Sequence, residues 1–339
     1  MKLSNKYSIG ALLCLFVIFG IVYYYFFSAL TGSGKTQYIY IDNDDTADSV
    51  IAKVRPFSTT QGMTGFSTLV RHSSYGEHIH TGRYEISLND GALTVFRHLK
   101  NGLQTPVNLT VPSVRTVDRL SSILSKRLLL DSLDIQQVLT DEAVCEKYDF
   151  DTLTIIAMFI PNTYDIYWNV TPEKLLDRMK NEHEKFWNNN RLSKAKAAGL
   201  TPTQVSILAS IIDEETANDE EKPMVAGMYI NRLKTDMPLQ ADPTVKFALK
   251  DFGIRRIYNY MLNIDSPFNT YRNTGLPPGP IRMPSVAGID AVLNHVKHDY
   301  LYMCAKEDFS GTHNFARTYQ EHLENARRYA EALNKRGIR

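Results

Sequence analysis

Residues 201–216 read Thr-Pro-Thr-Gln-Val-Ser-Ile-Leu-Ala-Ser-Ile-Ile-Asp-Glu-Glu-Thr, and the rest of the chain is organised around this stretch. Thr201 is a favourable N-cap, and Pro202 suits the first helical position, where the backbone N–H has no helical partner to lose. The apolar residues that follow recur at helical spacing. The pattern therefore predicts an amphipathic helix with one broad apolar face.

Three acidic residues end this helix, and the spacing directs only one of them at the apolar face. At about 100° per residue, Glu215 falls roughly 30° from the centre of that face, whereas Asp213 and Glu214 fall roughly 130° away, toward solvent. A carboxyl group held away from water resists ionisation, so its pKa rises and it carries a proton near neutral pH. A general acid that cleaves a sugar–oxygen bond needs this property. Structural acids on helices greatly outnumber catalytic ones, so the wheel by itself favours a structural acid paired with a basic neighbour such as Arg232.

Further blocks follow in order along the chain. They are Val-Ala to Ile-Asn-Arg-Leu at 225–233, Leu-Gln-Ala-Asp-Pro-Thr-Val at 239–245, Asn-Thr-Tyr at 269–271, Thr-Gly-Leu-Pro-Pro-Gly-Pro-Ile at 274–281, and His-Asn-Phe at 313–315. Together with residues 209–216, they resemble the signature blocks of the MltG (YceG-like) family of endolytic murein transglycosylases. The resemblance implies that the catalytic glutamate of the family is Glu215 in this chain.

The same resemblance suggests residues that bind the sugar substrate: Asn231, Gln240, Asp242, Asn269, Tyr271, Tyr164 and His313. Gln240 and Asp242 lie in a segment bounded by prolines, which predicts extended backbone and side chains that point the same way. Tyr164 belongs to an aromatic run at 159–168, whose rings would stack on sugars. Core packing is the alternative for Tyr164, and a structural role is the alternative for His313.

An uncharged apolar run covers residues 9–30, and Lys2 and Lys6 precede it. About 20 apolar residues suffice for a helix to span a bilayer, so the run predicts a transmembrane signal anchor rather than a shorter, cleaved signal peptide. The positive-inside rule leaves residues 1–8 as a cytoplasmic tail. The expected location is the inner (cytoplasmic) membrane, with a single pass and the catalytic domain on the outer, periplasmic side.

The segment after the anchor divides into a linker at 31–36, a small module at 37–105 and a larger domain at 106–339. Alternating residues predict strands at 37–41 and 80–88, with helices around Val50 and over 92–101. This arrangement resembles the LysM-like module of the family, either as a glycan-binding element or as a spacer. The expected fold class is α+β: one transmembrane helix, the LysM-like α/β module, and a mixed α+β YceG-like catalytic domain.

Composition restricts the functional class. The chain has 339 residues, 43% hydrophobic and 22% charged, with a net charge of +1, which does not indicate nucleic-acid binding. Its three cysteines are too few for a disulfide framework, and a bridge between Cys145 and Cys304 is left open. Because no cluster has metal-ligand spacing, no metal or cofactor is expected.

The leading hypothesis is a membrane-anchored lytic transglycosylase that cleaves the bond between N-acetylmuramic acid and N-acetylglucosamine in peptidoglycan strands. The resemblance implies that Glu215 alone serves as acid and base, because the 6-hydroxyl of the substrate replaces water and a 1,6-anhydro end forms. Cell-wall synthases at the membrane are the expected protein partners. The alternatives are a hydrolase that pairs Glu215 with Asp242 or Asp213, and a non-catalytic wall-binding or assembly protein. The residues do not distinguish endolytic from exolytic cutting.

Overall fold

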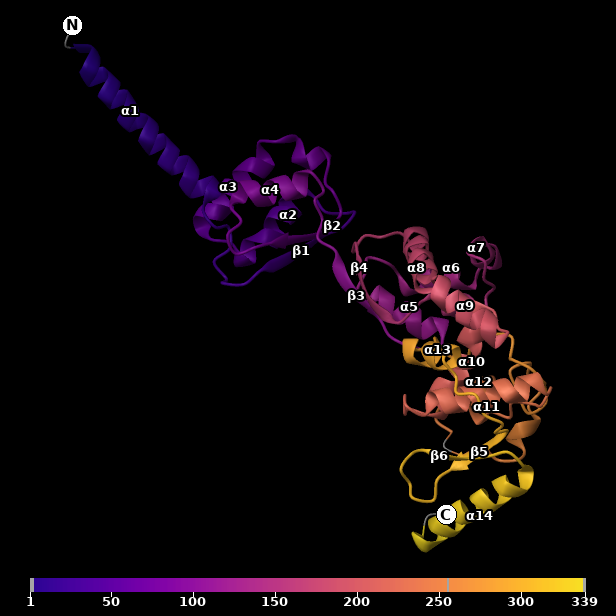
Figure 1. Cartoon of the computed structure of the whole chain (residues 1–339). Helices are drawn as coiled ribbons and strands as arrows, with labels where there is room; N and C mark the ends of the chain where they lie inside the picture. Colours follow the sequence, from indigo (N-terminus) through magenta and orange to yellow (C-terminus); the bar gives the residue numbers. More distant parts are fainter. Residues whose placement is uncertain (1–2, 255, 338–339) are drawn as a thin grey trace. The chain divides into compact units, whose positions relative to one another are not determined.

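The computed structural model describes residues 3–254 and 256–337 of a mixed α+β chain (Figure 1). The chain divides into two compact units. The first contains residues 1–109, 127–130 and 164–171, and the second contains residues 110–126, 131–163 and 172–339. The mixed α+β class agrees with the sequence-based expectation. Residues 1–2 of the expected cytoplasmic tail and residues 338–339 of the expected catalytic domain lie outside the described residues.

The N-terminal helix α1 (Leu3–Val22) continues into one turn of π-helix, Tyr23–Phe27. Ser8–Phe27 is long and apolar enough to cross a membrane, with a mean hydropathy of 2.3. The predicted span is too long at its C-terminal end, because the Leu30 side chain is fully buried in the core of the first unit. Thr31, predicted to begin a linker, is also buried and forms a β-bridge with Ser58.

The first unit is built on an antiparallel pair, β1 (Gln37–Ile41) and β2 (Gly82–Ile86), in which Ile39 lies opposite Tyr84. Three helices pack with this pair: α2 (Ala47–Val54), α3 (Thr60–Arg71) and α4 (Ala92–Lys100). The sequence predicts both strands, α2 and α4, but not α3. The order of elements fits the expected module, and its likeness to LysM stays a prediction.

Helix α3 contains two glycines, which lower its helical propensity, and for this reason the sequence does not predict it. One of them has a structural reason to be glycine. A Cβ atom at Gly65 would lie 2.0 Å from the carbonyl oxygen of Tyr25, so only glycine allows α3 to approach the π-helical turn this closely. Tertiary contact, rather than local preference, therefore explains this position.

Strand β3 (Val107–Val111) pairs with β4 (Asn162–Ile166) in a separate two-stranded sheet. The second unit is mainly helical, and its elements are α5 (Val117–Ser125), α6 (Ser132–Thr140), α7 (Glu142–Lys147), α8 (Pro172–Phe186), α9 (Asn189–Ala198), α10 (Pro202–Glu215), α11 (Lys222–Lys234), α12 (Asp242–Leu249), α13 (Val286–Leu293), β5 (Tyr302–Ala305), β6 (His313–Ala316) and α14 (Tyr319–Lys335). The predicted helix that begins after Thr201 is confirmed.

Helix α10 is the centre of the second unit. Its N-cap is Thr201, as predicted, and the Thr201 and Gln204 side chains form a reciprocal capping box. Every residue from 205 to 212 is buried, and α9, α11, α12 and α13 all contact the helix. The expectation of an amphipathic helix with a solvent-facing side is therefore wrong, because neighbouring elements cover α10 on all sides.

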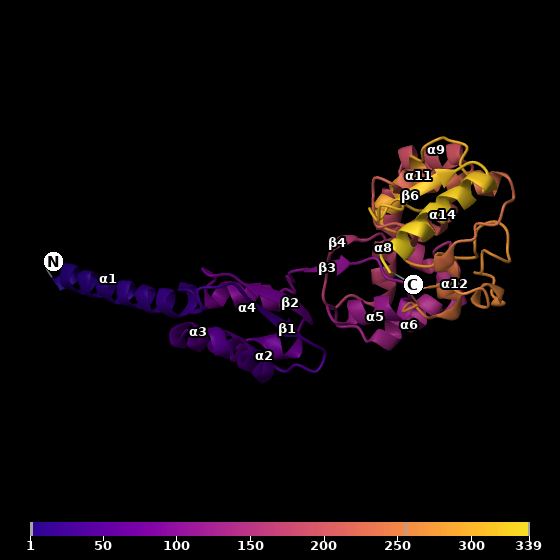
Figure 2. The same cartoon turned by 90° about the horizontal axis from the view of Figure 1, so that it is seen from below.

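The C-terminal part of this unit is an antiparallel β5–β6 hairpin on which α14 packs. Both views show α14 beside the hairpin (Figures 1 and 2). None of the α14 residues that the structure describes is buried, whereas α10 is buried through most of its length. The hairpin and α14 thus form an outer wall against the helical core.

Candidate active site

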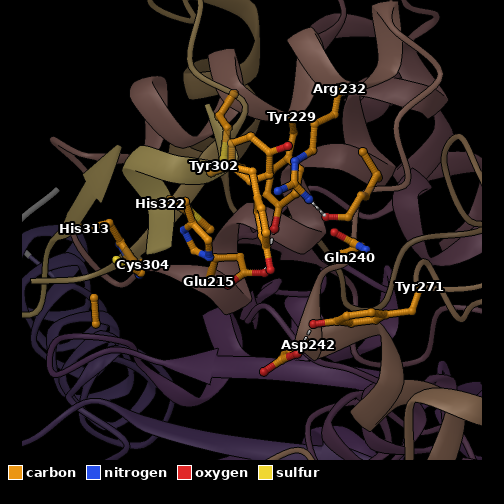
Figure 3. A pocket seen from close by; sticks show the side chains of 15 residues that line it. Glu215, Tyr229, Arg232, Gln240, Asp242, Tyr271, Tyr302, Cys304, His313 and His322 are labelled. Atoms are coloured by element: carbon orange, nitrogen blue, oxygen red, sulfur yellow. Dashed lines mark hydrogen bonds between the residues drawn. The ribbon is translucent and has the colours of Figure 1, made fainter. Parts of the chain in front are cut away.

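A cavity of about 340 Å³ lies at the C-terminal end of α10 (Figure 3). The helices α10 to α12 and the following loop contribute the polar lining residues Glu215, Tyr229, Arg232, Gln240, Asp242 and Tyr271. The hairpin and α14 contribute Tyr302, Cys304, His313, Tyr319 and His322. The cavity therefore joins segments that are up to about a hundred residues apart in the sequence.

Glu215 is the last residue of α10, and its carboxyl group is directed into the cavity (Figure 3). The hydroxyl of Tyr229 donates a hydrogen bond of 2.7 Å to Oε1 of Glu215. Burial raises the pKa of Glu215 to about 7, although the Tyr229 hydrogen bond opposes this effect. Nearby Asp242 raises the pKa further, while His313 and Arg232 lower it. The inward orientation predicted from the helical wheel is confirmed, and the group exchanges its proton near neutral pH.

The predicted solvent exposure of Asp213 and Glu214 is wrong. Asp213 is almost wholly buried, and its Oδ1 lies 2.7 Å from Nζ of Lys222 and accepts a 2.8 Å hydrogen bond from Oγ of Ser285. The Arg115 guanidinium donates hydrogen bonds of 2.8 and 2.9 Å to the two carboxylate oxygens of Glu214. A helical wheel assigns the face with Asp213 and Glu214 to water. In the structure, Lys222 and Arg115 from neighbouring segments pair with these two acids instead.

Glu214 also receives a hydrogen bond of 2.9 Å from Nη1 of Arg282. Both acids beside Glu215 are therefore bound in charge-assisted contacts, which fix the end of α10 from two sides. Glu215 differs from them because its hydrogen-bond partner is a neutral hydroxyl.

Arg232 lies beside Glu215 without an ion pair to it among the described residues. Its guanidinium instead donates hydrogen bonds of 2.6 Å to the carbonyl oxygens of Leu301 and Leu239. Burial lowers the pKa of Arg232. Arg232 therefore joins α11 to the segment before α12 and to the hairpin, and its positive charge favours the ionised form of Glu215. The structural interpretation of Glu215 as the partner of Arg232 does not fit this geometry.

Gln240 and Asp242 both line the cavity, but not on an extended segment as predicted. Gln240 has a left-handed backbone with φ of 50°, and Asp242 is the first residue of α12. The hydroxyl of Tyr271 donates a hydrogen bond of 2.6 Å to Oδ1 of Asp242 (Figure 3). The turn, rather than strand-like alternation, brings Gln240, Asp242 and Tyr271 to one cavity.

Three other predicted ligands of the substrate lie outside the cavity lining. The side-chain amide of Asn231 donates hydrogen bonds to the carbonyl oxygens of His298 and Tyr300. Asn269 is fully buried, and its amide holds the loop through the carbonyl oxygens at 262 and 264. Tyr164 is buried in β4 and belongs to the first unit. These placements support structural roles and give no support to substrate binding.

His313 lines the cavity at the start of β6, and Glu221 holds it in place. Oε1 of Glu221 accepts a 2.6 Å hydrogen bond from the backbone N–H of His313, and Oε2 lies 2.9 Å from the ring Nδ1. Glu221 is itself buried. This double contact fixes the orientation of the imidazole at the cavity.

Several residues of the cavity are absent from the sequence-based prediction. Tyr229, Tyr302 and His322 are not among the predicted site residues. The rings of Tyr302 and His322 stack with centroids 5.5 Å apart. Burial, followed by the charge of Arg232, lowers the pKa of His322 and favours its neutral form. In the sequence, Tyr319 and His322 are spaced i, i+3, as on one face of a helix, and this spacing is the signal that groups these two lining residues.

Among the residues that the structure describes, no group of three or more His, Cys, Asp or Glu side chains could hold a metal ion. Cys145 and Cys304, left open as a disulfide pair, are both free thiols. The chemistry available at the cavity is therefore that of one raised-pKa carboxyl, a second carboxylate, phenol and imidazole groups, and a buried guanidinium.

Comparison with known proteins gives a consistent result. A sequence model of the YceG-like family matches residues 39–328. An endolytic murein transglycosylase of Streptococcus pneumoniae serotype 2 (strain D39) is 27% identical over 305 residues, which cover 80% of this chain and 54% of that protein. An endolytic murein transglycosylase of Bacillus subtilis (strain 168) is 38% identical over 144 residues, 42% of this chain and 39% of that protein. The chain thus spans about half the length of the curated relatives it matches, or less.

The fold also resembles a solved structure. A 2.6 Å crystal structure of a protein described as YceG-like, from Listeria monocytogenes, aligns with a TM-score of 0.56 and 23% sequence identity. The alignment covers 86% of this chain and 99% of that chain. At this identity the likeness concerns the fold alone.

Proposed function

The chain belongs to the YceG-like family, and from this premise we propose that it is a lytic transglycosylase of peptidoglycan, anchored in the membrane. It cleaves the glycosidic bond between N-acetylmuramic acid and N-acetylglucosamine within glycan strands. The names of the relatives support this reaction class and favour endolytic cutting. The observation that carries the proposal is the carboxyl group of Glu215, which lines the cavity and whose pKa burial raises to about 7.

In the first step the protonated Glu215 carboxyl gives its proton to the glycosidic oxygen as the bond from that oxygen to the anomeric carbon breaks. A pKa near neutral pH suits this role, because the acid is protonated often enough and still releases the proton. In the second step the 6-hydroxyl of the muramic acid attacks the anomeric carbon, and Glu215 recovers the proton from that hydroxyl. The product is a 1,6-anhydro ring, and no water is consumed.

Intramolecular attack is favoured because the 6-hydroxyl is already held close to the anomeric carbon. The lining residues Gln240, Asp242, Tyr271 and His313 would bind sugar hydroxyl and acetamido groups. Asn231 and Asn269 would contribute indirectly, by holding the loops that surround the cavity. Peptidoglycan strands are the proposed substrate, and cell-wall synthases at the membrane are the proposed partners.

Asp242 supports one competing reaction, because it places a second carboxylate in the same cavity. A hydrolase would use such a group to activate water and would leave a reducing end. Digestion of purified glycan strands in water enriched in oxygen-18 distinguishes the two reactions. We expect muramic acid ends that are lighter than reducing ends by one water and carry no oxygen-18. Labelled reducing ends as the main product would show hydrolysis instead.

Glu215→Gln tests the catalytic assignment. We expect the variant to lose on the order of 100-fold or more in cleavage rate, because the amide cannot donate an acidic proton. Glu220→Gln is the matched control, since Glu220 is an exposed glutamate only five positions along the chain. Near wild-type turnover by purified Glu215→Gln protein would end the assignment. If the wild-type protein binds glycan strands but never cuts them, and the variant binds them too, the non-catalytic wall-binding alternative is favoured.

The membrane arrangement rests on Ser8–Phe27 and on the lysines that precede it. We expect the protein in the membrane fraction with the residues after the span outside the cytoplasm. In a protein whose three native cysteines are replaced by serine, Lys35→Cys, at an exposed position, should react with a membrane-impermeant maleimide in intact cells, whereas Lys6→Cys should react only after lysis. Labelling in the opposite order would contradict the orientation.

A further inference from the structure

The carboxyl group of Glu215 accepts a hydrogen bond from the hydroxyl group of a buried core residue, Tyr229. Tyr229 lies on α11 and is 1% exposed, so its ring is part of the core between α10 and α11. Tyr229 lines the cavity, and its hydroxyl donates the 2.7 Å hydrogen bond to Oε1 of Glu215 (Figure 3). We infer that Tyr229 is a positioning residue, which reserves Oε2 of Glu215 as the oxygen that carries and transfers the catalytic proton.

The direction of this hydrogen bond follows from acidity. Burial raises the pKa of Tyr229 well above its ordinary value, and the negative charge of Glu215 raises it further. The phenol therefore keeps its proton and acts as a donor throughout the reaction. In the neutral acid the oxygen that accepts this hydrogen bond is the carbonyl oxygen, so the acidic proton resides on Oε2.

This arrangement suits a carboxyl group that must serve twice. The inference rests on the proposed function, in which one carboxyl releases a proton and then recovers one. A carboxyl free to rotate would offer its two oxygens in turn, and the proton would often point away from the substrate. With Oε1 engaged by a rigid core residue, the same oxygen faces the substrate in both steps.

The hydrogen bond also regulates acidity. It stabilises the ionised form of Glu215 and is the largest influence that opposes the effect of burial on its pKa. Without it, Glu215 would be a weaker acid and would give up its proton more slowly in the first step. Tyr229 thus keeps a buried glutamate acidic enough to act near neutral pH.

Tyr229→Phe removes only the hydroxyl oxygen and keeps the ring that fills the core. We expect the pKa of Glu215 to rise by about one unit, since one hydrogen bond to a charged group is lost. The kcat for strand cleavage should fall roughly 3- to 10-fold with little change in KM, because a weaker acid transfers its proton more slowly. The high-pH limb of the kcat profile, where Glu215 ionises, should move upward with the pKa.

Replacing Tyr229 with a fluorotyrosine gives the opposite test. Fluorine makes the phenol a stronger donor while the ring shape is retained, so the pKa of Glu215 should fall below that of the wild type. If Tyr229 merely filled space, the pKa of Glu215 would not rise in Tyr229→Phe and fall in the fluorotyrosine protein. Tyr75→Phe is the matched control, because Tyr75 is an equally buried tyrosine in the first unit, with a hydroxyl that has no hydrogen-bond partner among the described residues.

The pKa is measured directly by nuclear magnetic resonance on full-length protein with carbon-13 in its glutamate carboxyls, and Glu215→Gln identifies the signal. Equal pKa values of Glu215 in the wild type, Tyr229→Phe and the fluorotyrosine protein would overturn the inference, even with full activity. This titration needs no substrate. An inactive wild-type protein would therefore refute the proposed function without affecting the test of Tyr229. If Tyr229→Phe does not fold, the comparison of the wild type with the fluorotyrosine protein still tests the inference.

Discussion

Nζ of Lys222 lies 2.7 Å from Oδ1 of Asp213, and the two side chains are only 7% and 4% exposed. The pair joins the first residue of α11 to α10, two positions before Glu215. Asp213 also accepts hydrogen bonds from the backbone N–H and the hydroxyl of Ser285, the N-cap of α13. One buried carboxylate therefore joins α10, α11 and α13 near the C-terminal end of α10.

Asp213→Asn should destabilise the second unit by about 3–5 kcal/mol, because it leaves the Lys222 charge buried without its main partner. Urea unfolding, followed by tryptophan fluorescence, measures the change. Asp219→Asn is the control, since Asp219 also lies 2.7 Å from Nζ of Lys222 but is 68% exposed. That variant should cost less than about 1 kcal/mol. Equal losses in the two variants would contradict the role of burial.

Glu214→Gln should lower the free energy of unfolding by about 1–3 kcal/mol, since the amide cannot serve both Arg115 and Arg282 as an ionised acceptor. Glu182→Gln is a suitable comparison, because Glu182 pairs with exposed cations of its own helix and should cost only about 0.3–0.5 kcal/mol for each pair. An exposed Glu214, as the helical wheel alone predicts, would make the variant nearly silent. Unchanged stability would support that simpler prediction over the structure.

Ionisation of Glu215 should make the wild type less stable as the pH rises. Its pKa is about 7 in the folded protein and 4.5 in the unfolded reference, so the folded state keeps a proton that the unfolded state releases between these values. Stability is therefore fully present below about pH 4.5, declines toward pH 7, and then levels off. The difference between the two pKa values corresponds to a change of up to about 3 kcal/mol in the free energy of unfolding. Glu215→Gln should lack this decline, and unfolding of both proteins at several pH values measures it.

His183 should have the opposite effect in the acid range. Burial, together with the nearby charge of Lys180, lowers the pKa of His183 from 6.5 to about 4. The unfolded state then takes up a proton that the folded state excludes, so stability is full above about pH 6.5 and is lost as the pH falls toward 4. His183→Gln should reduce this loss, whereas His72→Gln, at an exposed position, should leave it unchanged. Parallel pH curves for the wild type and His183→Gln would contradict the prediction.

The local pattern of the sequence determines much of this architecture. The apolar N-terminal run, the Thr201 cap, the bounds of α10 and the inward direction of Glu215 all follow from spacing and capping within one segment. Such features depend on the period of a single helix and on neighbouring residues, and the sequence displays both directly. The short sequence blocks that resemble the family are likewise read from neighbouring residues within one segment.

Tertiary structure alone decides the rest of the site. A helical wheel assumes one dry face and one wet face, so it cannot show that Lys222 and Arg115 cover the second face of α10. Nor can it show that α11 places the Tyr229 hydroxyl on Glu215, or that α14 brings His322 to the same cavity. These contacts join segments distant in the chain, and their geometry depends on how whole helices pack. The sequence therefore predicts that Glu215 points inward, whereas packing determines its partners and hence its acidity.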